Sequence, residues 1–311
     1  MQYFLILIGI ALFFILWTLI EQKSLVVSDF EINKSDLPHS FHNTKIIVLA
    51  DLHNAAFGRN NERLVRRIKS LKPDFIVVAG DMISKSSPCY PSNAYVLLEE
   101  LSRTYKIYYG YGNHEQRNER LLLETCSQKH MNSRYEYMVL QKYQEQELLS
   151  STWVEYKEEL LRNGVTFLDN ESVELIKGQD RIKISGVSIA KDFFTRSKAP
   201  IMEEGYLSSL IGEKSQDYYH ILIAHNPVYF KEYVAWGADL IISGHLHGGM
   251  VRIPGIGGVI SPQVKLFPKY DAGIYSENGS SMIVSRGLGS HSMMPRYFNT
   301  PEIVQIMLKR S

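Results

Sequence analysis

Residues 45–53 read KIIVLADLH, an apolar run (46–50) that ends directly on Asp51 and His53. A short run of Ile, Val and Leu is typical of a β-strand. Four later apolar runs end in the same way: 75–79 before Gly80-Asp81, 107–109 before Gly112-Asn113-His114-Glu115, 221–223 before Ala224-His225-Asn226, and 240–242 before Gly244-His245-Leu246-His247. In an α/β sheet the carboxyl ends of the strands meet at one rim, where ligands bind. The pattern therefore predicts one site assembled from the whole chain.

The segments between these runs predict an α/β fold. Helices are expected at 61–71 and 93–103, between strands 46–50, 75–79 and 106–109, which is the βαβαβ order of parallel strands. From Val165 onward strands dominate, and those expected are 165–168, 172–176, 181–185, 187–190, 220–223, 239–242, 282–285 and 303–308. This total favours two stacked sheets covered by helices.

Residues 116–160 interrupt the alternation. The part from 116 to 150 is rich in Glu, Gln, Arg, Leu and Tyr and contains neither Gly nor Pro, so we expect a helical insertion that ends before Asn163-Gly164. The insertion is either a cap over the site, because it leaves a motif directly, or a solvated pair of surface helices.

The N-terminus differs in kind from the rest of the chain. Residues 3–20 carry no charge and are about as long as a bilayer is thick, which predicts a single-pass anchor (1–22) rather than a buried core helix. Residues 23–44 are expected to be a polar linker and entry segment, and residues 45–311 a single domain. Lys23, Lys34 and Lys45 follow the span and no basic residue precedes it, so the positive-inside rule favours a domain on the cytoplasmic side of the cell membrane.

Composition narrows the possible partners. The net charge of +1 gives no general attraction to a nucleic-acid polymer, and none is expected as a partner. The two cysteines, Cys89 and Cys126, are too few for a disulfide framework or a thiolate zinc site. The oligomeric state stays open.

The residue types at the five strand ends are those of a metal centre. An Asp-x-His or His-x-His segment in extended conformation directs two side chains to the same side, and Asp81 has two oxygens with which to bridge two cations. Oxygen and nitrogen ligands without thiolate suit a pair of divalent ions, which can be manganese, iron, zinc, cobalt or magnesium. Affinity order alone does not choose among these metals, and manganese is our first expectation. Such a pair activates water and holds phosphoryl oxygens. His114 is placed to bind a phosphoryl oxygen or to protonate the leaving group, with Asp51 or Glu115 as its orienting partner.

Taken together, the five motifs resemble the calcineurin-like metallophosphoesterase superfamily over about residues 44–309. The resemblance implies a four-layer αββα sandwich of two mixed sheets with a dinuclear centre. The implied ligands are Asp51, His53, Asp81 and His247 for the first metal, and Asp81, Asn113, His225 and His245 for the second. His114 stands in the position of the catalytic histidine. Glu115 departs from the more usual Asp, and the long segment after it departs from the short connection of the nearest subgroup.

The C-terminal loops narrow the resemblance. Residues 244–275, the run Ser285-Arg286-Gly287-Leu288-Gly289, and Pro301-Glu302-Ile303 are similar to a membrane-tethered bacterial branch. That branch contains phosphodiesterases and a UDP-2,3-diacylglucosamine pyrophosphate hydrolase. The resemblance implies a phosphodiesterase or pyrophosphohydrolase of a membrane-associated or lipid-linked phosphoester. A phosphomonoesterase of broad specificity and a non-catalytic membrane scaffold are the alternatives.

Three residues near the C-terminus are candidates for substrate binding. Arg286 and Arg296 have guanidinium groups that fit phosphate oxygens, although pairing with a nearby carboxylate is an equal alternative. His291 either lines the mouth of the site or has a role within its loop.

Overall fold

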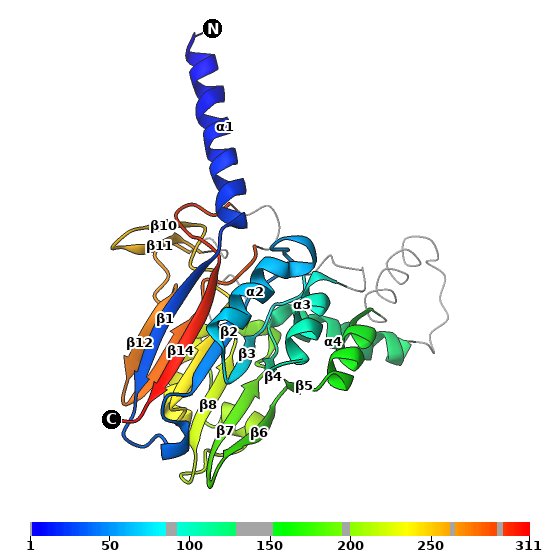
Figure 1. Ribbon diagram of the computed structural model, residues 1–311, viewed down its shortest axis with the longest axis vertical. Helices are drawn as coiled ribbons and strands as arrows, with labels where there is room; N and C mark the ends of the chain where they lie inside the picture. Colours follow the sequence, from blue (N-terminus) through cyan, green and yellow to red (C-terminus); the bar gives the residue numbers. More distant parts are fainter. Residues whose placement is uncertain (1, 85–91, 129–151, 195–199, 262–264, 291–294) are drawn as a thin grey trace.

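The computed structural model describes residues 2–84, 92–128, 152–194, 200–261, 265–290 and 295–311. These residues form two stacked six-stranded sheets with helices on their outer faces, and one long helix that projects away from them (Figure 1).

The first sheet has the strand order β1-β14-β2-β3-β4-β5. Its strands are β1 (Val26–Asn33), β14 (Glu302–Lys309), β2 (Lys45–Leu49), β3 (Phe75–Ala79), β4 (Lys106–Gly110) and β5 (Val165–Leu168). Strands β2 to β5 are parallel, β14 is antiparallel to β2, and β1 is parallel to β14.

The second sheet has the order β12-β13-β9-β8-β7-β6. Its strands are β12 (Gly273–Glu277), β13 (Ser280–Val284), β9 (Leu240–Ser243), β8 (Tyr219–Ala224), β7 (Asp180–Val187) and β6 (Glu171–Lys177). The four central strands are parallel and the two edge strands are antiparallel to them. A separate hairpin pairs β10 (Val251–Ile253) with β11 (Gly257–Ile260).

Helices complete two outer layers. The α-helices are α1 (Gln2–Lys23), α2 (Glu62–Leu71), α3 (Asn93–Ser102), α4 (Asn113–Gln128), residues 152–162, α6 (Tyr206–Ile211) and α7 (Phe230–Trp236). The short 3₁₀ helices are η1 (His39–Phe41), η2 (Arg59–Asn61), η3 (Lys191–Phe194) and η4 (Pro227–Tyr229).

The alternation of side chains along β2 explains why the layers stack. Ile47 and Leu49 pack against α2, α3 and residues 152–162, whereas Ile46 and Val48 face the second sheet. All four are fully buried, and burying each aliphatic side chain contributes roughly 1.5–3 kcal/mol. On the far side of the second sheet, α6 and α7 cover a third core. The four-layer αββα sandwich expected from the sequence is confirmed.

The five predicted motifs all follow central strands. Asp51, Asp81 and Asn113 come after β2, β3 and β4 of the first sheet, and His225 and His245 come after β8 and β9 of the second. Because β2, β3 and β4 are mutually parallel, as are β8 and β9, the motifs of each sheet lie at one rim of that sheet.

Several local expectations were wrong. The segment expected to be a linker contains β1, an edge strand in which only one of eight side chains is fully buried, so it carries little apolar signal. Strand β7 ends at Val187, and no strand covers residues 188–190. Strands β10, β11 and β12 were not predicted. Of the expected helical insertion, α4 and residues 152–162 are helical, and 129–151 lie outside the described residues.

Helix α1 is not a core helix. The mean hydropathy of the most apolar 18-residue stretch of Tyr3–Lys23 is 2.7, and none of that stretch is buried. The helix is therefore long and apolar enough to cross a membrane. It meets the domain in its C-terminal half, where the Trp17 ring lies 5.0 Å from the Phe298 ring at an interplanar angle of 57°.

Candidate metal centre

The loops that carry the predicted ligands have unusual backbone conformations. Asp51, His53, Asp81, His245 and His247 all have φ between 46° and 72°. Non-glycine residues rarely adopt this left-handed region, and such strain concentrates at functional sites, where the surrounding structure maintains it. Five of the seven predicted ligands share this feature, which indicates that their side chains are held in place for a purpose other than stability.

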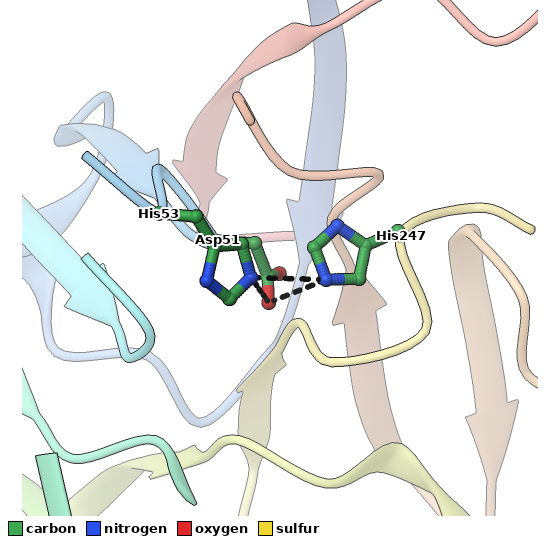
Figure 2. Close-up of side chains that lie close together, drawn as sticks. All are labelled: Asp51, His53 and His247. Carbon is green, nitrogen blue, oxygen red and sulfur yellow. Dashed lines mark hydrogen bonds and ion pairs between the residues drawn. The ribbon is translucent and has the colours of Figure 1, made fainter. Parts of the chain in front are cut away.

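One group of ligands surrounds Asp51 (Figure 2). His53 Nε2 and His247 Nε2 lie 3.1 Å apart, and each faces Asp51 Oδ1, at 3.8 Å and 3.4 Å. All three side chains are buried, and their ligand atoms lie within 4.8 Å of one another. The residues could therefore hold one cation.

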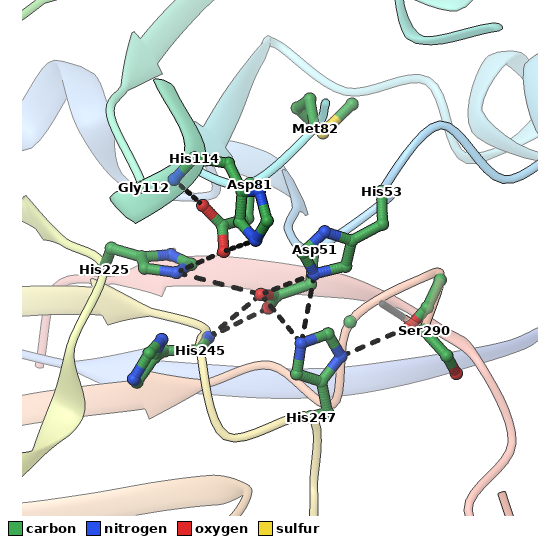
Figure 3. Close-up of polar contacts among 12 residues, drawn as sticks. Asp51, His53, Asp81, Met82, Gly112, His114, His225, His245, His247 and Ser290 are labelled. Atoms are coloured by element: carbon green, nitrogen blue, oxygen red, sulfur yellow. Dashed lines mark hydrogen bonds and ion pairs between the residues drawn. The ribbon is translucent and has the colours of Figure 1, made fainter. Parts of the chain in front are cut away.

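A second group surrounds Asp81 (Figure 3). Asp81 Oδ2 lies 3.3 Å from His225 Nε2 and 3.8 Å from His114 Nε2. Asp81, His225 and His245 could hold a cation, and so could Asp81, His53 and His114. Asp81 thus belongs to both alternatives and lies between the histidines of the two sheets.

Asn113, the first residue of α4, carries a neutral amide oxygen that could serve as a ligand. Its Oδ1 is buried, and among the described residues it has no hydrogen-bond partner. A buried polar atom without a partner costs free energy. A cation coordinated by this oxygen would remove that cost.

The electrostatics of the site also call for positive charge. Burial raises the pKa of Asp51 to about 7, although His225 acts in the opposite direction. Burial also acts to raise the pKa of Asp81, but His225 and His114 outweigh it and hold that pKa well below its usual range. Burial acts to lower the pKa of His225, yet Asp81 and Asp51 raise it to about 10. Protonated imidazole therefore balances the carboxylates here, and a bound cation would replace those protons, since histidine ligands must be neutral.

Backbone groups orient the ligands. His225 Nδ1 lies 2.6 Å from Ala79 O and His247 Nδ1 lies 3.2 Å from Gly289 O. These contacts leave Nε2 of each ring to face the site, as in metal centres where the second ring nitrogen is fixed by a carbonyl. The Asp51 carboxylate also accepts a hydrogen bond from the His245 backbone N–H at 3.0 Å.

Glu115 has a role that the sequence did not reveal. Its fully buried carboxylate accepts hydrogen bonds from the backbone N–H groups of Asp81 (2.8 Å), Met82 (3.0 Å) and Gly112 (2.9 Å), and from the Tyr109 hydroxyl (2.8 Å). It therefore joins the β3 and β4 loops. The Asp81 carboxylate lies near the His114 ring, with its Oδ2 3.8 Å from His114 Nε2.

A close approach at Gly112 fixes the same loops. A Cβ atom at this position would overlap the Asp81 carboxylate and lie 2.5 Å from Asp81 N. The glycine in the Gly-Asn-His motif therefore leaves room for the Asp81 side chain.

The two candidate substrate arginines make contacts within the protein. Arg286 pairs with Glu302 through Nη2 at 2.8 Å, which is the alternative that the sequence allowed. Arg296 is 2% exposed, and its guanidinium donates to Ser290 Oγ and to the carbonyl groups of Asn299, Arg286 and Gly289. Both guanidinium groups are engaged within the protein, so neither supports a phosphate contact in this structure. His291 lies outside the described residues.

Phe194 is a site residue that no sequence pattern signalled. Its ring lies 5.2 Å from His245 and 6.3 Å from His225, between centroids. Asn226 holds this segment in place, because its Nδ2 donates to Phe193 O at 3.0 Å. Residues 191–194 stand about 30 positions from the nearest motif, so their approach to the site depends on tertiary structure.

Comparisons with known proteins agree with this geometry. The profile of the calcineurin-like phosphoesterase family matches residues 44–249. YkuE of Bacillus subtilis, an uncharacterized metallophosphoesterase, is 25% identical and aligns with 93% of this chain and 87% of its own. The UDP-2,3-diacylglucosamine pyrophosphatase LpxG of Chlamydia trachomatis is 26% identical, over 86% of this chain and 85% of its own.

A transmembrane protein with a metallophosphoesterase domain from Bos taurus is 24% identical, over 91% of this chain and 57% of its own. Together with the exposed apolar helix α1, the name of this relative suggests a membrane anchor. With a matching profile over most of the chain and a cluster of residues that could hold a metal, the chain belongs to the calcineurin-like phosphoesterase family and is a hydrolase of phosphoric esters.

Proposed function

We propose that this protein is a membrane-anchored phosphodiesterase or pyrophosphohydrolase that acts on a lipid-linked phosphoester. The observation that carries the proposal is the buried cluster in which Asp81 Oδ2 lies between His225 Nε2 and His114 Nε2, at 3.3 Å and 3.8 Å. The apolar helix α1 and the similarity to LpxG support a substrate that is itself held in a membrane.

We further propose that the cluster holds two divalent cations, with manganese as the first choice. The proposed ligands are Asp51, His53, Asp81 and His247 for one ion, and Asp81, Asn113, His225 and His245 for the other. When bound, such ions would activate a water molecule and withdraw charge from phosphoryl oxygens. The mixture of carboxylate, amide and imidazole donors fits borderline and hard divalent ions and disfavours soft ones.

His114 is the proposed catalytic residue. Its side chain is 13% exposed, whereas that of Asp81 beside it is 3% exposed, so the imidazole stands at the accessible edge of the cluster. From there it can donate a hydrogen bond to a phosphoryl oxygen or a proton to the leaving oxygen.

The proposed domain division follows the elements. Helix α1 would be the anchor, and the catalytic domain would begin at β1 because that strand is part of the first sheet. Lys23, Lys34 and Lys45 support a domain on the cytoplasmic side. Accessibility of the domain to protease in intact and in opened cells would test this orientation.

The activity is tested with full-length protein in detergent and Mn²⁺, using an aryl phosphodiester, an aryl phosphomonoester and a nucleoside-diphosphate acyl sugar. Asp81→Asn should abolish turnover and Mn²⁺ binding, whereas the exposed Asp217→Asn should leave both unchanged. Faster cleavage of the monoester would favour a phosphomonoesterase. Turnover by the wild type no higher than that of Asp81→Asn on all three esters would refute an enzyme and favour a scaffold.

A further inference from the structure

A patch of exposed apolar side chains lies beside the base of α1. Five residues form this apolar patch: Ile253, Ile256, Leu266, Phe267 and Phe298, which are between 44% and 67% exposed. Isolated exposed apolar residues need no explanation, but a group of large ones marks an interaction site.

The segments that carry the apolar patch are joined by their backbones. The β10–β11 hairpin contains Ile253 and ends next to residues 265–267, because Phe267 N donates to Val259 O and Ile260 pairs with Leu266. On its other side, Arg252 N donates to Tyr297 O. The hairpin lies next to the C-terminal end of α1 (Figure 1). The patch is therefore one surface on a hydrogen-bonded framework.

This framework is also fixed to α1. The Tyr297 ring lies 5.5 Å from Phe14, and the Phe298 ring lies 5.0 Å from Trp17. Thr300 Oγ1 donates to Glu21 Oε1 at 2.8 Å. Tyr297, Phe298 and Thr300, which precede β14, thus hold the last turns of α1.

These contacts set the depth of the patch relative to the helix. At 1.5 Å per residue, Trp17 lies about 9 Å and Phe14 about 14 Å along α1 from its last residue, Lys23. Both lie within the uncharged run 3–20, which must occupy the apolar interior if the helix spans a bilayer. Tyr297 and Phe298 then stand at the level where lipid begins. A domain docked in this way meets the bilayer with the apolar patch.

The same framework reaches the metal cluster. The buried Asn299 donates through Nδ2 to His247 O at 2.6 Å and to Gly249 O. Gly248 and Gly249 lead directly from His247 into β10. Asn299 follows Phe298 of the apolar patch and donates a hydrogen bond to the backbone of His247, a proposed metal ligand. One residue therefore connects the patch with the metal cluster.

We propose that a phospholipid bilayer surface covers the apolar patch, so that the domain lies on the membrane with the metal cluster near the level of the headgroups. This inference rests on the membrane anchor of the proposed function and adds a second, independent contact with lipid. The patch continues the surface of α1, which favours lipid over a protein partner as its occupant. Lys265 and Lys269 flank Leu266 and Phe267, and their ammonium groups suit anionic headgroups.

The test measures the depth of single labels in the full-length protein. In a Cys89→Ser, Cys126→Ser background, a cysteine at Ile256 carries an environment-sensitive fluorophore. The protein is reconstituted in vesicles of phosphatidylethanolamine and phosphatidylglycerol that contain a lipid with a shallow spin-label quencher. Interfacial insertion places apolar side chains roughly 5–10 Å below the headgroups. We expect a blue shift and strong quenching at this position, and the same at Leu266→Cys.

Two further labels serve as controls. Ile176→Cys replaces an equally exposed isoleucine (68%) on the edge strand β6, far from α1, and should show no quenching. Leu12→Cys lies near the middle of the uncharged run 3–20, so it is read in parallel vesicles that carry a deep acyl-chain spin-label quencher and reports whether α1 itself is inserted. Quenching at Leu12→Cys with none at Ile256→Cys would overturn the inference and leave the anchor intact. A blue shift without quenching at Ile256→Cys would indicate a protein occupant and overturn it as well.

An unquenched label at Leu12→Cys would refute both the membrane anchor and the inference that rests on it. None of these readouts depends on catalysis, so failure of the proposed activity is recognised separately. A matched functional check compares Ile256→Ser with Ile176→Ser. Only the former should raise KM for an ester presented in vesicles, and both should cleave a soluble aryl phosphodiester as the wild type does.

Discussion

Replacing Glu115 by glutamine tests whether this buried carboxylate positions the metal cluster. The oxygen Oε2 accepts from the N–H groups of Asp81 and Gly112, and Oε1 accepts from Met82 N–H and the Tyr109 hydroxyl. In the better of its two orientations, the glutamine amide places its NH₂ group at the Oε1 position. The Tyr109 hydroxyl can then turn and accept, but Met82 N–H loses its partner.

The magnitude follows from these contacts. One buried donor left without a partner costs about 1–3 kcal/mol, and the two bonds that remain at Oε2 fall from charged to neutral strength, about 1 kcal/mol each. Burial raises the pKa of Glu115, so removal of the charge offsets part of that loss. We expect Glu115→Gln to lower the free energy of unfolding by roughly 2 kcal/mol and to weaken Mn²⁺ binding by about 10- to 100-fold, the usual effect of removing a group that supports a ligand.

Urea unfolding and titration calorimetry with Mn²⁺ measure the two effects on the full-length protein in detergent. Glu100→Gln is the matched control, because Glu100 is a more exposed carboxylate that pairs with Lys69 and Arg103. Its removal should cost less than about 1 kcal/mol and leave Mn²⁺ binding unchanged. If Glu115→Gln bound Mn²⁺ as tightly as Glu100→Gln does, Glu115 would support the fold without positioning the cluster, and the reasoning would be refuted.

Three other substitutions have defined outcomes. Gly112→Ala should abolish Mn²⁺ binding in calorimetry while the protein still folds, because the new methyl group displaces the Asp81 carboxylate; full occupancy would contradict this. Arg296→Lys should lower the midpoint of urea unfolding by an amount that corresponds to about 3–5 kcal/mol, because an ammonium group cannot replace the buried guanidinium contacts. An unchanged midpoint together with a raised KM would instead support a substrate role for Arg296. Burial lowers the pKa of His220 to about 4 from 6.5, so the unfolded chain binds the additional proton between these values and stability falls as the pH drops from 6.5 to 4. His220→Leu should remove roughly 2 kcal/mol of this loss of stability, measured by urea unfolding at pH 6.5 and pH 4. If the unfolding free energy of the variant fell with pH as much as that of the wild type, this explanation would be wrong.

The central strands could be predicted because their environment is uniform. Strands β2, β3, β8 and β9 are buried on both faces, so each reads as an unbroken aliphatic run. Strand β1 could not be recognised, because it gains its place by pairing with β14 and leaves polar side chains in solvent. In the β10–β11 hairpin Ile253 and Ile256 are exposed and the remaining apolar residues are only partly buried, so the hairpin lacks the buried apolar face that signals a strand in a soluble domain.

Site residues likewise divide into those that a local sequence pattern reveals and those that only the tertiary structure brings to the site. Asp51, Asp81 and His225 could be found because each stands next to the strand that positions it. The contacts of Glu115 with the β3 loop, and of Phe194 with His245, join segments more than 30 residues apart and leave no local pattern.

The two arginines illustrate the converse difficulty, because their residue type alone left phosphate binding and pairing within the protein equally open. Arg296 is satisfied by backbone carbonyl groups, and sequence alone does not reveal carbonyl groups brought close by a loop.

The pairing of β1 with β14 has a consequence for biosynthesis. Val26 and its partner Glu302 are 276 residues apart, so the first sheet stays incomplete until β14 has left the ribosome. At about 5–20 residues per second, roughly 14 to 55 s separate the synthesis of these two strands. If α1 enters the membrane during that interval, β1 stays close to the bilayer surface without its partner strand β14, and its backbone hydrogen-bonding groups are unpaired. The anchor then acts as a tether for the assembly of the sheet and keeps that strand from pairing with other nascent chains.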